Sequence, residues 1–199
     1  MKATSKMVIG VDEVGMGSLA GPVVVCAVQA PRHLRIGNFG VHDSKQLTPK
    51  QRETVAHELV NSKKLKYQIA YAYPKTIDKI NIFQASRKAM ARAIAKIQNP
   101  NTKNQMVLID GPYIIKNLKL PQQAIIRGDR TVFAIAAASI LAKVYRDNMM
   151  RNYAKRFPEY GFERHKGYGT KLHYAMLYQH GPCKLHRKSF ILNHDKNRN

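Results

Sequence analysis

Acidic residues interrupt three apolar runs in a chain that is otherwise strongly basic. The 199 residues include 34 lysines and arginines but only 12 aspartates and glutamates, which gives a formal net charge of +22. Asp12 and Glu13 nevertheless stand side by side in one apolar run, Asp110 ends a second, and Asp147 lies on a third. A carboxylate in an apolar segment is costly to bury unless a cation or another partner offsets its charge. The fold therefore has to bury these runs while bringing their acids to a compensated site.

The apolar runs and the turns between them predict an α/β fold. From valine-rich segments bounded by glycine and proline, strands are expected at residues 7–14, 22–30, 65–73, 106–110 and 124–127. From apolar periodicity and terminal signals, helices are expected at residues 48–62, 82–98, 133–157 and 171–180. Strands mixed with helices favour one α/β domain over residues 1–150, with a basic helical extension over residues 151–199 packed on it.

The net charge of +22 favours a polyanionic partner, with nucleic acid as the first candidate and an anionic membrane surface as the rival. The longest nearly apolar stretch, residues 132–142, is far shorter than a bilayer span, so no membrane protein is expected. The N-terminal sequence reaches carboxylates too soon for a signal peptide. The two cysteines form no CxxC pair, which disfavours a disulfide scaffold. We expect a cytoplasmic protein.

Asp12 and Asp110 each lie where a strand-like run approaches a glycine. Functional groups of α/β sheets gather outside the strand ends, and clustered carboxylates bind Mg²⁺ or Mn²⁺. Two such ions can activate water and stabilise the leaving oxygen of a phosphodiester. Consecutive strand residues face opposite ways, so Glu13 can share a site with Asp12 only if the strand ends or bulges there, or if one of them contributes a backbone carbonyl. Ordinary salt bridging explains any one of these acids, but four acids in apolar settings favour a metal-dependent nuclease.

Two basic segments have both a functional and a structural interpretation. Lys88, Arg92 and Lys96 recur at i,i+4 spacing on the predicted helix 82–98, which contains no acid. Such a stripe faces phosphates or is simply solvated; the absence of acids favours phosphates. Residues 162–174 combine glycines, basic residues and tyrosines, which suits either a loop against a sugar–phosphate backbone or a packed loop.

Six segments, in order and over nearly the whole chain, together resemble bacterial ribonuclease HII. They are residues 10–25, the DSKQL segment at 43–47, LIDG at 108–111, RGDRTVFAIAAASILAKVYRD at 127–147, HKGYGT at 165–170 and GPCKLHRKSF at 181–190. The resemblance implies a ribonuclease H-like fold with a mixed five-stranded sheet and a helical C-terminal part. It also implies endonucleolytic cleavage of RNA in RNA–DNA hybrids and at single ribonucleotides in duplex DNA, leaving 3′-hydroxyl and 5′-phosphate ends.

The resemblance also implies roles for individual residues. Asp12, Glu13, Asp110 and Asp147 match the family's metal-site acids, which use Mn²⁺ or Mg²⁺. Tyr168 matches a tyrosine that stacks near the junction between ribonucleotide and deoxyribonucleotide. The expected substrate-binding residues are Gly15, Met16, Gly17, Lys45, Tyr168 and Arg187. The family usually has Gly-Arg-Gly where this chain has Gly15-Met16-Gly17, so an arginine side chain is missing here.

Two other functions are compatible with parts of the sequence. Another metal-dependent nuclease or resolvase on the same fold would share the acids but would have no use for the tyrosine and the glycine pair. A non-catalytic basic RNA-binding protein would fit the composition but would leave the buried carboxylates without a role. The expected partners are RNA–DNA hybrids and ribonucleotide-containing duplex DNA, bound by a monomer.

Overall fold

A five-stranded mixed sheet forms the centre of the computed structural model, which describes residues 7–41, 47–98 and 105–191. The strands are β1 (Met7–Val14), β2 (Val23–Pro31), β3 (Lys66–Ala72), β4 (Met106–Asp110) and β5 (Gln122–Ile125). Their spatial order is β3-β2-β1-β4-β5. β1, β2 and β3 pair antiparallel, whereas β4 runs parallel to both β1 and β5.

The ladder between β1 and β4 is shorter than β1 itself. β4 pairs with β1 only as far as Val11, which lies opposite Ile109. On its other side, β1 stays paired with β2 through Val14 and without a bulge. The last three residues of β1 therefore extend beyond the β4 ladder, with one edge open.

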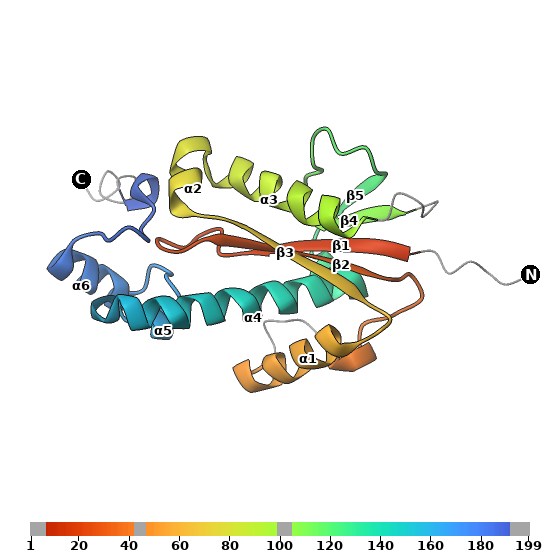
Figure 1. Cartoon of the computed structure of the whole chain (residues 1–199), viewed down its shortest axis with the longest axis horizontal. Helices are drawn as coiled ribbons and strands as arrows, with labels where there is room; N and C mark the ends of the chain where they lie inside the picture. Colours follow the sequence, from red (N-terminus) through yellow and green to blue (C-terminus); the bar gives the residue numbers. More distant parts are fainter. Residues whose placement is uncertain (1–6, 42–46, 99–104, 192–199) are drawn as a thin grey trace, which may run out of the picture.

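Helices cover both faces of the sheet (Figure 1). α2 (Pro74–Ile80) and α3 (Ile82–Ile97) lie on one side, and α1 (Pro49–Asn61) and α4 (Phe133–Arg156) lie on the other. Alternate residues of β1 and β2 enter two separate apolar clusters, one under α3 and one under α4. Gly10 lets α4 approach β1 closely, since a Cβ at this position would lie 2.2 Å from the carbonyl carbon of Ala134.

The C-terminal part packs on one end of this core. It contains α5 (Phe162–His165), α6 (Lys171–His180) and, between helices, short 3₁₀ turns such as Pro158–Tyr160. A small apolar cluster joins Phe162 and Leu185 of this part to Ala20 and Met150. The expected domain boundary at residue 150 falls inside α4, which continues to Arg156.

The α/β architecture and the mixed five-stranded sheet expected from the sequence are confirmed. Three of the expected elements, residues 7–14, 106–110 and 171–180, have the predicted bounds, and the others differ by one or two residues at an end. The sequence reasoning missed α2, the four-residue α5 and the short 3₁₀ turns. Among the described residues, no helix has the length and apolar character needed to cross a bilayer.

Candidate active site

A cavity of about 450 Å³ lies at the end of β1 and β4, where β1 extends beyond its neighbour. Side chains from both strands, from α1 and α4, and from the turn before α6 surround it. Its lining comprises Asp12, Glu13, Val14, Gly15, Met16, Gly17, Arg52, Asp110, Asp129, Ser139, Lys143 and Tyr168. Four of these residues are acidic and two are basic, in a chain with an almost threefold excess of basic residues.

Asp12 and Glu13 reach this cavity from opposite faces of β1. Asp12 is 7% exposed and lies on the α4 side, where it is hydrogen-bonded to the Ser139 side chain. Glu13 lies on the α3 side, where the positive charge of Arg87 favours its ionised form. The strand neither ends nor bulges at these residues; both line one cavity because this stretch of β1 has no β4 beside it.

Asp110 and Asp129 enter the cavity from the β4 side. Asp110 is the last residue of β4, and Asp129 lies in a 3₁₀ turn three residues after β5 ends. The backbone N–H of Asp129 donates to Oδ1 of Asp110 over 3.3 Å. Asp129 is only 6% exposed, so the turn holds a buried carboxylate beside the partly buried Asp110.

Asp147 does not line the cavity. Its Oδ1 accepts an ion pair from Nζ of Lys143 at 2.8 Å, one helical turn away on α4. Ser139 is the α4 residue next to Asp12, and Asp147 follows it by eight residues, which is about 12 Å along a helix axis. The structure therefore differs from the expected set of four acids: it brings Asp12, Glu13 and Asp110 together with Asp129, and Asp147 lies outside this group. The signal missed in the sequence is the Gly-Asp pair that follows a strand adjacent to β4.

Burial and mutual repulsion make the ionised carboxylates unfavourable in this cavity. Burial raises the pKa of Asp12 well above its usual value, and the nearby Glu13 and Asp110 raise it further. Burial also raises the pKa of Glu13 to about 7, although Arg87 opposes the rise. Oε2 of Glu13 is a buried atom that has no hydrogen-bond partner among the described residues. A cation in the cavity would offset both effects.

Two buried arginines hold the loop after β1, residues 15–22, by hydrogen bonds from the side of the protein interior. Arg187 donates to the carbonyls of Gly15, Met16 and Gly21 at 2.7–3.1 Å and is 0% exposed. Arg146, also 0% exposed, donates to Pro22, Ser18 and other acceptors of the same region. Arg187 is an expected substrate contact, but the structure places its guanidinium behind the loop, where it is buried and bonded to the loop carbonyls.

Gly15, Met16 and Gly17 line the cavity as expected, but for different reasons. Gly15 has φ +90°, and a Cβ there would lie 2.3 Å from Nε of Arg146, so only glycine fits. A Cβ at Gly17 would meet nothing within 4 Å, so this residue leaves open space in front of the loop. Met16 also packs against an apolar cluster that includes Val23 and Ile77.

Tyr168 faces the loop from the C-terminal part. The backbone of Tyr168 forms an isolated β-bridge with Ser18. The centroid of its ring lies 5.2 Å from the guanidinium carbon of Arg146 and 5.7 Å from Nζ of Lys143. The C-terminal part therefore completes one wall of the acidic cavity. Lys45, the remaining expected substrate contact, lies outside the described residues.

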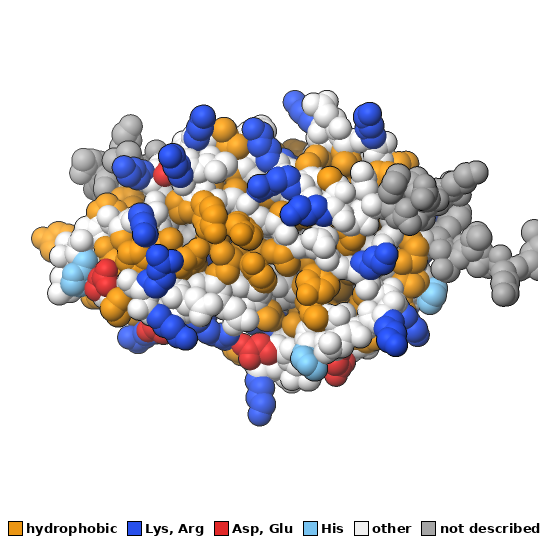
Figure 2. Space-filling model, in the orientation of Figure 1, with side chains coloured by type: hydrophobic (Ala, Val, Ile, Leu, Met, Phe, Trp, Pro, Cys, Tyr) orange, Lys and Arg blue, Asp and Glu red, His pale blue; other side chains and the backbone are white. Residues whose placement is uncertain are grey.

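The basic residues of the cavity differ from those singled out in the sequence. Arg52 and Lys143 line the cavity, whereas Lys88, Arg92 and Lys96 do not. Arg92 instead donates to the carbonyl of Tyr71 on the edge strand β3 at 2.6 Å. Lysines and arginines are spread over the face seen in Figure 2, with few acids among them. The positive charge is thus a property of the surface rather than of one helical stripe.

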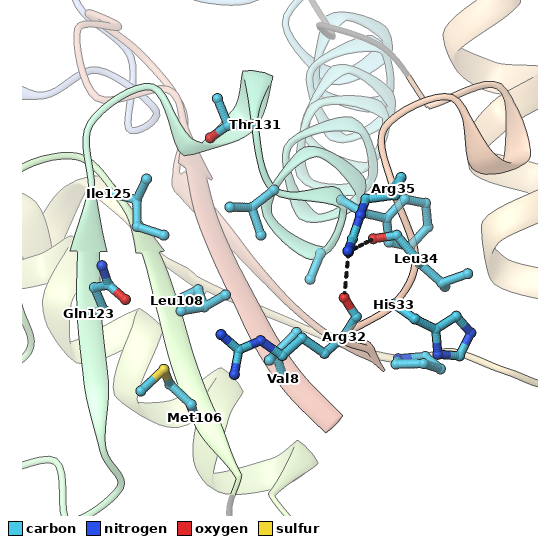
Figure 3. Close-up of a pocket in the computed structure, with 14 residues that line it drawn as sticks. Val8, Arg32, His33, Leu34, Arg35, Met106, Leu108, Gln123, Ile125 and Thr131 are labelled. Atoms are coloured by element: carbon cyan, nitrogen blue, oxygen red, sulfur yellow. Dashed lines mark hydrogen bonds between the residues drawn. The ribbon is translucent and has the colours of Figure 1, made fainter. Parts of the chain in front are cut away.

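A larger hollow of about 930 Å³ lies near the start of β1 and of α4 (Figure 3). It is lined by apolar residues such as Val8, Leu108 and Phe133, with a loop that carries Arg32 and Arg35 at its rim. Arg35 turns back to donate to the carbonyls of Arg32 and Leu34. The hollow has no acidic lining residue among those described, so its chemistry differs from that of the acidic cavity.

The acidic cavity fits a hard divalent cation by donor type, burial and charge. Carboxylate oxygens are the ligands that Mg²⁺ and Mn²⁺ prefer. The partnerless oxygen of Glu13 and the raised pKa values of Asp12 and Glu13 show sites that a cation would stabilise. As they stand, no three acidic, histidine or cysteine side chains in the described part of the chain converge to ligate one ion.

Comparisons with known proteins find relatives in sequence and in fold. The chain is 47% identical over 193 residues to a ribonuclease HII of Caldicellulosiruptor saccharolyticus, covering 97% of this chain and 91% of the relative. It is 48% identical over 184 residues to a ribonuclease HII of Chlamydia caviae, covering 92% and 84%. The solved ribonuclease H2 of Pyrococcus horikoshii matches with a TM-score of 0.75 and 27% identity, covering 92% of this chain and 93% of that one. A structure of the complex of PCNA and ribonuclease HII from Archaeoglobus fulgidus matches with a TM-score of 0.77 at 24% identity, covering 92% and 94%; this likeness concerns the fold alone.

A mixed five-stranded sheet whose strand ends meet at a carboxylate-lined cavity defines a nuclease of the ribonuclease H fold, a class that depends on divalent metal ions. The family model described as ribonuclease HII matches residues 9–193. The chain belongs to the ribonuclease HII family.

Proposed function

We propose that this chain is an endoribonuclease that hydrolyses the RNA strand of RNA–DNA hybrids and single ribonucleotides embedded in duplex DNA, leaving 3′-hydroxyl and 5′-phosphate ends. The observation that carries the proposal is the convergence of Asp12, Glu13, Asp110 and Asp129 on one cavity of a ribonuclease HII family member. A non-catalytic RNA-binding role would leave these buried acids unexplained.

We propose that these four residues, Asp129 replacing Asp147, hold Mg²⁺ or Mn²⁺. A solved ribonuclease HIII that matches with a TM-score of 0.68 at 17% identity is described as a complex with Mn²⁺. Bound divalent ions would supply activation of a water molecule and stabilisation of the leaving oxygen. The protein contributes the buried carboxylates, and Ser139 orients Asp12 by a hydrogen bond.

The loop after β1 and the Tyr168 turn would bind the substrate strand. The carbonyls of Gly15 and Met16 point inward to Arg187, which leaves the outer side of the loop for ligands. The 2′-hydroxyl is the group that separates RNA from DNA at a given position, and backbone groups at glycine approach it closely. Tyr168 would stack on the neighbouring sugar, while Lys143 and Arg52 lie where phosphates would pass.

Incubation with a duplex that contains one ribonucleotide tests the proposed function. We expect a single cut beside the ribonucleotide with Mg²⁺ or Mn²⁺, none with chelator, and none in a matched all-DNA duplex. Asp12→Asn and Asp110→Asn should abolish cleavage, because each removes a carboxylate ligand of the metal ion. Hybrid binding should persist, because each also lowers the negative charge that faces the phosphates. Cleavage by either variant at the wild-type rate would refute the site assignment.

A further inference from the structure

Three buried histidines lie behind the Tyr168 turn and take no part in the proposed chemistry. His165 of α5, His173 of α6 and His186 of the segment after α6 are 8%, 0% and 3% exposed. The rings of His165 and His173 stack at 4.2 Å between centroids. Burial lowers the pKa of His173 and of His186 to about 4, so both rings are neutral near pH 7.

Hydrogen bonds fix the tautomers of these rings, and those of His186 and His173 follow from each other. The backbone N–H of Cys183 donates to Nδ1 of His186 at 2.9 Å, so the proton of His186 is on Nε2. That Nε2–H faces Nε2 of His173 at 3.0 Å, which must accept it. The proton of His173 is therefore on Nδ1, which donates to the carbonyl of Tyr168 at 2.9 Å. The result is a directional chain from Cys183 through His186 and His173 to Tyr168.

The first ring of this chain and its last acceptor lie beside the two walls that would bind the substrate. His186 forms a β-bridge with Ala20, and the next residue, Arg187, holds the carbonyls of Gly15 and Met16. At the other end, the Tyr168 carbonyl also accepts from the backbone N–H of Thr170 at 2.8 Å. The backbone of Tyr168 is thus fixed from behind, while its ring faces the cavity.

We propose that His186 and His173 form a positioning relay that sets Tyr168 against the Gly15–Gly17 loop and thereby raises selectivity for an isolated ribonucleotide. The inference rests on the proposed function of the loop and of Tyr168. Neither histidine touches the substrate: both act through the Tyr168 carbonyl. An isolated ribonucleotide has one productive register, so a displaced ring penalises it more than a long hybrid, which offers many.

A matched pair of variants isolates the last hydrogen bond of the relay. The amide of His173→Asn places an N–H near the position of Nδ1 and keeps the donation to Tyr168, whereas His173→Leu removes it. Both variants leave Nε2–H of His186 without its acceptor, so this loss cancels in the comparison. We expect His173→Leu to lower kcat/KM on the single-ribonucleotide duplex about tenfold more than on a long hybrid, as for one lost buried hydrogen bond. His173→Asn should restore most of this ratio.

The same substitutions in a Tyr168→Ala background separate positioning from stability. If the relay acts through the Tyr168 ring, His173→Leu should leave the substrate ratio unchanged once the ring is gone. Equal losses on both substrates, in both backgrounds, would overturn the relay and indicate a purely structural role. His57→Leu is the control, since the side chain of this exposed histidine of α1 has Asn61 as its hydrogen-bond partner among the described residues.

Circular dichroism of each variant reports whether it folds. If His173→Leu does not fold, His186→Gln and His186→Met test the preceding hydrogen bond of the relay, from residue 186 to His173. Only the glutamine can still donate toward His173. An equal substrate ratio in these two variants would overturn the relay. A wild-type protein that cuts neither substrate with metal would instead refute the proposed function, which distinguishes the two failures.

Discussion

At the scale of single residues, the most consequential feature is which aspartate completes the acidic cavity. Asp129 and Asp147 both follow apolar segments, but only Asp129 lines the cavity with Asp110. Asp147 is paired with Lys143 at 2.8 Å, and this contact lowers the positive charge that Lys143 offers to a phosphate.

The two aspartates should respond differently to the same substitution. Asp129→Asn removes a carboxylate from the cavity and should lower cleavage by at least about a hundredfold, the equivalent of nearly 3 kcal/mol of transition-state stabilisation. Asp147→Asn should retain cleavage within a few fold and bind the hybrid slightly more tightly, since Lys143 is released. Single-turnover cleavage and filter binding of both variants check this. A larger loss for Asp147→Asn would restore the sequence-based assignment.

At the scale of elements, the histidine pair makes the C-terminal part sensitive to acid. The pKa of His173 and of His186 is lowered to about 4 by burial, below the value of about 6.5 expected in the unfolded chain. A lowered pKa contributes stability that is complete above pH 6.5 and is lost as the pH falls toward 4. The neighbouring His165, whose pKa burial also lowers although Glu163 opposes the fall, and the ring of Tyr160 face the pair.

Thermal unfolding between pH 7 and pH 4.5 measures this contribution. We expect the wild-type midpoint to fall more steeply over this range than that of the double variant His173→Asn, His186→Gln, whose amides do not titrate. His57→Asn, which removes an exposed histidine, should follow the wild type. Parallel curves for the wild type and the double variant would show that protonation of the pair does not destabilise the fold.

The elements also show how far the sequence could predict this molecule. Apolar periodicity and glycine placement predicted the strands, the main helices and the position of Asp12 and Asp110 at one cavity, because these signals are local. α2 was missed because its seven residues are too few to establish a helical repeat, although Ile77 and Ile80 recur at i,i+3. The shared cavity of Asp12 and Glu13 depends on where the β1–β4 ladder stops, which no local pattern encodes. The burial of Arg187 depends on carbonyls about 170 residues away.

At the scale of the whole molecule, the net charge of +22 predicts binding to nucleic acid that weakens with salt, because each phosphate contact releases counterions. Four of the basic residues form two pairs that differ in position. Arg52 and Lys143 line the acidic cavity, whereas Lys88 and Lys96 lie on the exposed side of α3 and do not line it. Positive charge is spread over the surface seen in Figure 2. Only contacts made by the bound duplex determine how steeply its affinity falls with salt concentration.

Two double variants that remove equal charge separate these groups. Arg52→Gln with Lys143→Gln should make the slope of log affinity against log salt shallower by about 2, one for each lost phosphate contact. Lys88→Gln with Lys96→Gln should change it by less than half as much, because these side chains lie outside the cavity at which the duplex would be cut. Hybrid binding is measured between 50 and 300 mM salt, about the range in which counterion release dominates, with chelator to prevent cleavage. The reverse order of effects would place the duplex along α3, as the i,i+4 spacing of its basic residues suggests, and would require the binding face to extend well beyond the acidic cavity.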